Sequence, residues 1–185
     1  CFGEISWAYQ IGYAIQQVDK DVTGGKPWVQ LSGKAVFFIY VVAECISYYN
    51  TATTNEFWAA AEVVVDGVSF LVAAPACVYL LVSAPGKLLD TSGKFFVGVM
   101  SIVAVVYPLY NFVIDAPMYM ERYAADQLAN KTYFPFLEGL VDASLRRVPT
   151  RNLTDWSGDM GWMTTYFTIG AWSGILLMFA PRCVC

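Results

Sequence analysis

Long apolar runs separated by short polar stretches dominate the chain. Four of them approach the roughly 20 apolar residues that a helix needs to cross a bilayer core about 30 Å thick. They span about 35–51, 57–82, 95–114 and 161–180, and a fifth run, about 1–18, is shorter and more polar. No run shows the alternating pattern of a barrel strand. We therefore predict an all-α transmembrane bundle of four full spans plus a partial N-terminal span.

The polar stretches predict where the chain turns. Residues 19–34 contain paired glycines and a proline, residues 51–56 form a short polar turn, and residues 83–94 contain a Pro-Gly pair. Residues 1–114 are accordingly predicted to hold the first transmembrane helices. Residues 115–160 are predicted to be an extramembrane segment, and residues 161–185 a final span with a short tail.

The 115–160 segment is predicted to contain two short helices at the membrane interface. Asp115 stands just before Pro117, a pattern typical of a helix start. Pro135 opens the second helix, which carries four apolar residues on one face. These residues are Leu137, Leu140, Val141 and Leu145.

The charges of the connections predict an orientation. The loops 19–34 and 83–94 and the tail carry more basic than acidic residues, and we call this end the basic side. The turn 51–56 and the 115–160 segment carry more acids, and we call that end the acidic side. Short basic loops mark the cytoplasmic side, so the 115–160 segment is predicted to be extracytoplasmic. Asn130 and Asn152 begin N-x-T sequons there and are possible glycosylation sites.

Composition supports the membrane class and narrows the chemistry. Hydrophobic residues make up 57% of the chain and charged residues only 14%, against roughly 25% charged in soluble domains. The net charge of −4 with no basic stripe argues against nucleic-acid binding. The chain begins inside a semi-apolar run without an initiator Met, so we expect it to be a piece of a longer protein.

The absence of histidine removes the usual ligand of haem, zinc and copper and the usual general base. Lysines lie only outside or at the edge of the apolar runs, which disfavours a retinal Schiff base. We therefore predict no metal site, no catalytic residues and no enzymatic activity. Cys183 and Cys185 follow the last span and are possible lipidation sites.

Acidic residues interrupt the apolar runs. An ionised carboxylate at bilayer depth costs at least about 2.5–3.5 kcal/mol, so such residues face the bundle interior. Glu62 and Asp66 are four apart and share a helical face. Glu4 in "GEISWAYQ" matches Glu44 in "AECISYYN", which hints at an internal repeat of roughly 40 residues. The predicted polar pocket or ion-binding site consists of Glu44, Glu62, Asp66, Glu4, Ser47 and Asn50. The alternative is that these groups only fix helix packing through hydrogen bonds.

Three stretches together resemble an uncharacterised family of polytopic membrane proteins. They are "VVAECISYYNTATTNE", "IDAPMYMERYAADQ" and "WMTTYFTIGAWS", and the resemblance covers roughly residues 40–175. It implies further spans upstream and carries no activity. The positions that carry it are Glu44, Asp115, Pro117, Met118, Tyr119, Trp162 and Tyr166.

The resulting functional prediction is a multi-pass integral membrane protein with a buried acidic pocket. Its favoured role is a non-catalytic subunit of a larger membrane assembly, with other membrane protein subunits and membrane lipids as partners. A small proton- or cation-coupled transporter is the alternative, and a membrane-embedded lipid-modifying enzyme is least favoured. The many Tyr and Trp residues serve packing and interface anchoring or line a groove for a bound lipid.

Overall fold

The computed structural model describes residues 2–83, 91–148, 152–157, 164 and 168. Within these residues every regular element is a helix, in agreement with the all-α prediction. The elements are α1 (Phe2–Thr23), α2 (Pro27–Thr53), α3 (Glu56–Ser83), α4 (Thr91–Tyr110), the π-helical turn η1 (Asn111–Asp115), α5 (Ala116–Leu128), α6 (Phe136–Leu145) and α7 (Leu153–Trp156).

Among the described residues, three helices are long and apolar enough to cross a membrane: Pro27–Thr53, Glu56–Ser83 and Gly93–Leu128. At 1.5 Å per residue the first two extend about 40 Å, enough for the hydrocarbon core and part of both interfaces. The first helix, α1, is not among the three, because its glutamines and charged residues lower its mean hydropathy. The four full spans predicted from the sequence are therefore not confirmed, and the predicted span 161–180 lies outside the described residues apart from 164 and 168.

The third span differs most from the prediction. The helix does not begin anew at Asp115 but continues through η1 into α5, so that Gly93–Leu128 is one apolar helix of 36 residues. Pro108 and Pro117, which lack the N–H group that an α-helix needs, lie on either side of η1. The π-helical turn between them rearranges the backbone hydrogen bonds, so the helix passes both prolines without ending.

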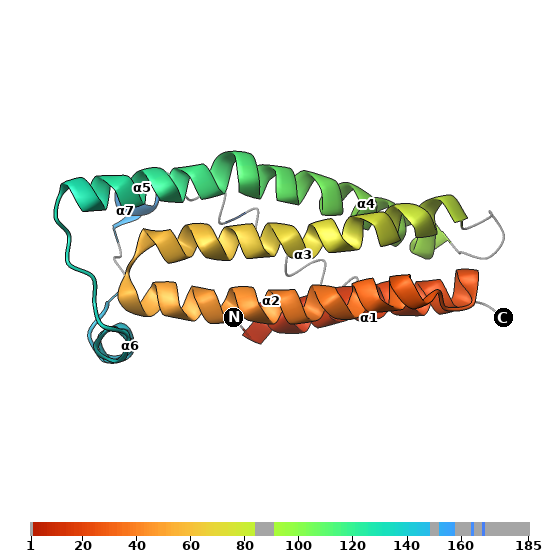
Figure 1. Cartoon of the computed structure of the whole chain (residues 1–185), viewed down its shortest axis with the longest axis horizontal. Helices are drawn as coiled ribbons and strands as arrows, with labels where there is room; N and C mark the ends of the chain where they lie inside the picture. The colour runs from red at the N-terminus through yellow and green to blue at the C-terminus, as the bar shows by residue number, and fades with distance from the viewer. Residues whose placement is uncertain (1, 84–90, 149–151, 158–163, 165–167, 169–185) are drawn as a thin grey trace.

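The long helices lie side by side, with α3 in the middle (Figure 1). One side of α3 packs against α4 and α5, and the other packs against α2, with α1 alongside α2. The α1–α2 connection lies at the same end as the C-terminus of α3, which is the basic side. The α2–α3 turn and the C-terminus of α5 lie at the opposite end, the acidic side (Figure 1). This arrangement places the two ends as the sequence predicts.

The core between these helices is made of aliphatic and aromatic side chains. Its largest fully buried members include Ile11, Ile15, Tyr40, Phe70 and Leu80. The helices α1 and α2 approach each other closely where Gly12 meets Gly33. A Cβ atom added at Gly33 would lie 2.6 Å from the Gly12 carbonyl oxygen, so only glycine permits this contact. Small residues at helix crossings give such close packing within membranes.

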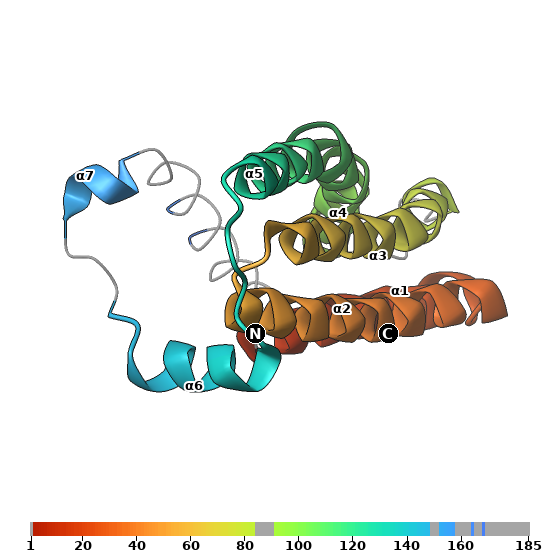
Figure 2. The ribbon, with the colours of Figure 1, turned by 60° about the vertical axis from the view of Figure 1, so that its left-hand side comes forward.

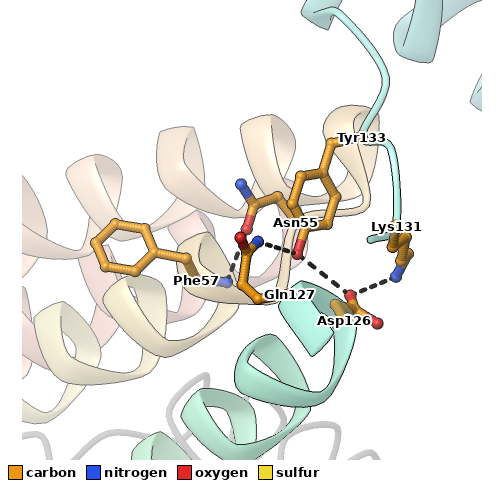
Figure 3. Close-up of polar contacts among 6 residues, drawn as sticks. All are labelled: Asn55, Phe57, Asp126, Gln127, Lys131 and Tyr133. Atoms are coloured by element: carbon orange, nitrogen blue, oxygen red, sulfur yellow. Dashed lines mark hydrogen bonds and ion pairs between the residues drawn. The ribbon is translucent and has the colours of Figure 1, made fainter. Parts of the chain in front are cut away.

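At the acidic side, polar contacts close the ends of α3 and α5 (Figure 3). The Asn55 side chain accepts a hydrogen bond from the Phe57 backbone N–H and so caps the start of α3. Beyond α5, Lys131 donates to Asp126 at 2.6 Å, and Tyr133 lies between Asp126 and Gln127. These contacts fold the chain back toward α2 after α5 ends.

The helix α6 lies across the end of α2 (Figures 1 and 2). Pro135 is its N-cap residue, so this helix starts where the sequence predicts. Gly139 faces the carbonyl of Ala52 with no room for a side chain. The Arg147 guanidinium donates hydrogen bonds to the carbonyl oxygens of Thr51 (2.5 Å) and Ala52 (3.1 Å). Arg147 thus binds the free C-terminal carbonyls of α2, which a cation stabilises.

Candidate functional site: a carboxylate row inside the bundle

Acidic residues from three helices meet inside the bundle, and we call them the carboxylate row: Glu4, Glu44, Glu62 and Asp66. Glu4 lies near the start of α1, Glu44 in the second half of α2, and Glu62 and Asp66 in the first half of α3. Because α1 packs antiparallel to α2, and α2 antiparallel to α3, these positions lie at a similar height along the bundle axis. Glu44 is buried, with 5% of its surface exposed, and the other three are half-buried.

The carboxyl groups of the row interact with one another and with a neighbouring hydroxyl group. The carboxyl groups of Glu4 and Glu44 lie within hydrogen-bonding reach of each other. Two ionised carboxylates this close repel each other, and a proton on one of them allows a hydrogen bond between them. Glu62 accepts a hydrogen bond from the Ser47 hydroxyl, which joins α3 to α2. Each carboxyl group in the row also interacts electrostatically with the next one.

The row continues toward α4 through neutral polar groups. The hydroxyl of Tyr107 lies within electrostatic reach of Asp66 and Glu62 and is hydrogen-bonded to the Asn111 side chain. The Asn111 amide also donates to the Val63 carbonyl oxygen at 3.1 Å, which fixes the start of η1 against α3. The absence of a side chain at Gly67 allows this approach, because an added Cβ would lie 2.8 Å from the Phe112 ring and 3.4 Å from the Asn111 Cβ.

Two acceptor oxygens near this junction are buried and have no hydrogen-bond partner within the described residues: Asp66 Oδ1 and Asn111 Oδ1. Asn111 is 1% exposed, so bulk water does not reach it. A buried acceptor without a donor costs about 1–3 kcal/mol. A proton, a water molecule or a small cation at this point would remove that cost.

A second set of polar groups leads from the row to the acidic side. Asp115, at the end of η1, is buried and interacts with Tyr110 and Arg122. The Arg122 guanidinium lies over the Tyr119 ring, 5.4 Å from its centre. Tyr119 in turn lies within electrostatic reach of Glu62 and Glu56. Polar side chains thus extend from the middle of the bundle to the surface at the N-terminal end of α3.

The structure brings together five of the six residues predicted for the polar pocket. These are the four members of the row and Ser47, which bonds Glu62. The sixth, Asn50, lies two turns nearer the acidic side, where its backbone carbonyl accepts from Thr54 at the end of α2. Within the described residues, the Asn50 side chain is not among the groups that interact with the row.

The polar residues of the third span were not predicted as part of the site. Tyr107, Asn111 and Asp115 are spaced four apart, so they line one face of an otherwise apolar helix. Such a stripe is a recognisable pattern, but Asn111 was included in an apolar run and Asp115 was interpreted as the start of a surface helix. Within the described residues no cluster of three or more His, Cys, Asp or Glu side chains is arranged to hold a metal ion.

The predicted modification sites lie away from the row. Asn130 is exposed just beyond α5 in a left-handed backbone conformation (φ 50°). Asn152 is exposed and accepts a hydrogen bond from the Thr154 backbone N–H, capping α7. The predicted lipidation sites Cys183 and Cys185 lie outside the described residues.

Comparison with known proteins gives no relative: no family model, curated protein or solved structure matches the chain. The resemblance to uncharacterised polytopic proteins therefore stays a prediction. Of the positions that carry it, Asp115 and Tyr119 belong to the polar path described above.

Proposed function

We propose that the chain belongs to a multi-pass integral membrane protein that moves protons through its interior by way of the carboxylate row. The membrane class is supported by the three membrane-length apolar helices. The observation that carries the proton role is the close approach of the Glu4 and Glu44 carboxyl groups, because two ionised carboxylates at this separation repel each other and one shared proton removes the repulsion. Carboxylates close together in a medium of low dielectric constant share protons, because full ionisation of all four is too costly.

The arrangement of the row suits transfer in steps. A proton on one carboxyl group moves to the neighbouring carboxylate as the hydrogen bond between them reverses, and no covalent bond other than O–H changes. The Ser47 hydroxyl is hydrogen-bonded to Glu62, and the Tyr107 hydroxyl interacts electrostatically with Asp66 and Glu62. A hydroxyl group can both donate and accept, so both are suited to relay a proton. Buried ionisable residues within membranes mark ion and proton pathways.

Proton flux into liposomes that contain the full chain tests this proposal. A potassium gradient with valinomycin drives the flux, and a trapped pH-sensitive dye reports it. We expect Glu62→Gln and Asp66→Asn to lower the rate at least tenfold, because an amide does not exchange a proton with a carboxylate. Glu121→Gln is the matched control, since Glu121 is exposed on α5. Equal rates for all variants, or no flux above empty liposomes, would reject the proton role.

The orientation is part of the same proposal. The lysine-rich connections at the basic side support a cytoplasmic location for that end, with α6 and Asn130 outside. The predicted role as a subunit of a larger assembly also stays a prediction. Its support is the exposed apolar face of α6, where Leu137 and Leu145 are 74% and 80% exposed.

A further inference from the structure

A groove on the outer surface of α1 and α2 is separate from the carboxylate row. It has a volume of about 480 Å³, which is in the size range of small-molecule sites. Its walls are mainly aromatic rings, those of Tyr9 and Tyr13 from α1 and of Phe37 and Phe38 from α2. Gly33, where the two helices touch, forms part of its floor.

The rings of the groove are held in place by one another. Tyr9 stacks on Tyr13 with ring centres 6.2 Å apart and meets the edge of Phe37 at 5.7 Å. Phe37 packs against Phe38 at 5.3 Å. The exposed fractions are 55% for Tyr9, 51% for Tyr13 and 65% for Phe38, so the groove opens outward. Since α2 is one of the helices long and apolar enough to cross a membrane, an opening on its outer surface would face lipid acyl chains in a bilayer.

The charge at the groove is positive. Lys34 is the only charged residue among those that line it within the described part of the chain. It lies seven residues from the first residue of α2, about 10 Å along the axis, so in a bilayer it would lie at the edge of the hydrocarbon layer near the basic side. A lysine at this depth extends its ammonium group toward the headgroups. The aromatic walls by Phe37 and Phe38 lie deeper, on the side away from the headgroups.

We propose that this groove binds one anionic phospholipid, with its phosphate at Lys34 and an acyl chain along the rings of Tyr9, Phe37 and Phe38. A cation at the headgroup end and an apolar wall below it match the two parts of that molecule. A neutral lipid would leave the Lys34 charge without a counter-ion. This inference does not depend on the proton role, because Lys34 does not take part in the carboxylate row.

Spin-labelled lipids in nanodiscs that contain the full chain test the proposal. Electron paramagnetic resonance gives the association of labelled phosphatidylglycerol relative to labelled phosphatidylcholine. We expect Lys34→Gln to lower the preference for the anionic lipid about fivefold, the effect of one basic residue worth about 1 kcal/mol. Lys20→Gln is the matched control, because Lys20 is an exposed lysine at the same end of the bundle. Phe38→Ala is expected to weaken the association of both lipids.

Three outcomes would overturn the proposal. One is an unchanged lipid preference in Lys34→Gln, and another is an equal loss in Lys20→Gln. The third is a disulfide dimer formed by Tyr13→Cys in the membrane, which would show that a second copy of the chain occupies the groove. Glu62→Gln is expected to keep the lipid preference whether or not it loses proton flux, so failure of one proposal leaves the other standing.

Discussion

Gly139 on α6 lies directly against the backbone carbonyl of Ala52 at the end of α2. An alanine at 139 would place its Cβ on that oxygen, and the backbone of α2 cannot move aside cheaply. Overpacking of this kind costs about 1–3 kcal/mol. We expect Gly139→Ala to detach α6 and to reduce the hydrogen-exchange protection of its amides about tenfold or more.

The control for this change is Ser144→Ala on the same helix. Ser144 is exposed and, within the described part of the chain, its hydroxyl bonds only the Leu140 carbonyl one turn earlier, so its loss leaves the docking contact intact. Equal exchange rates in Gly139→Ala and the parent chain would show that α6 is not held through this contact.

Arg147 provides a second, independent test of how α6 is attached. Its guanidinium bonds the carbonyls of Thr51 and Ala52 and forms an ion pair with Asp142 at 2.8 Å. A lysine ammonium group cannot reproduce the planar arrangement of N–H donors in the guanidinium group. We expect Arg147→Lys to weaken the docking by about 1–3 kcal/mol, seen as faster exchange in α6 and in the last turn of α2.

Arg146→Gln is the matched control for this prediction, since Arg146 is the neighbouring exposed arginine. A similar change in exchange for both variants would mean that the general charge of this segment matters, and that the specific hydrogen bonds of Arg147 do not.

How much of this architecture can be predicted from sequence depends on how far apart in the chain the contacting residues lie. Runs of apolar residues predicted the all-helical fold and the approximate positions of α2 and α3, because helix burial in lipid is a local property. The docking of α6 was not predicted, because Gly139 and Arg147 contact carbonyls more than 80 residues away in the chain.

Of the candidate site, the individual acids could be predicted, since a carboxylate in an apolar run is conspicuous. The contribution of Tyr107 became visible only when α4 was placed against α3.

Asp19 joins α1 and α2 near the basic side. It is fully buried and accepts hydrogen bonds from Gln30 at 2.7 Å and from Thr23 at 2.5 Å. We expect Asp19→Ala to destabilise the bundle by about 1–3 kcal/mol, because the Gln30 amide loses an acceptor in a buried position. Thermal unfolding in detergent, followed by circular dichroism, measures the loss as a lower Tm.

Asp21→Ala is the control for this measurement, because Asp21 is an exposed acid two residues further along α1. A fall in Tm of the same size in both variants would contradict a specific role for the Asp19 hydrogen bonds.

Tyr107→Phe separates proton transfer from packing. The change removes only the hydroxyl that reaches Asn111 and lies near Asp66, and it keeps the ring that packs edge-on against Phe70 at 4.9 Å between ring centres. If the row extends to α4 through this hydroxyl, proton flux in liposomes should fall several-fold while Tm changes little. Tyr79→Phe, in the same bundle but against Trp28, is the control. Unchanged proton flux in Tyr107→Phe would show that the pathway does not extend beyond Asp66. A large drop in Tm would show that the hydroxyl group stabilises the fold.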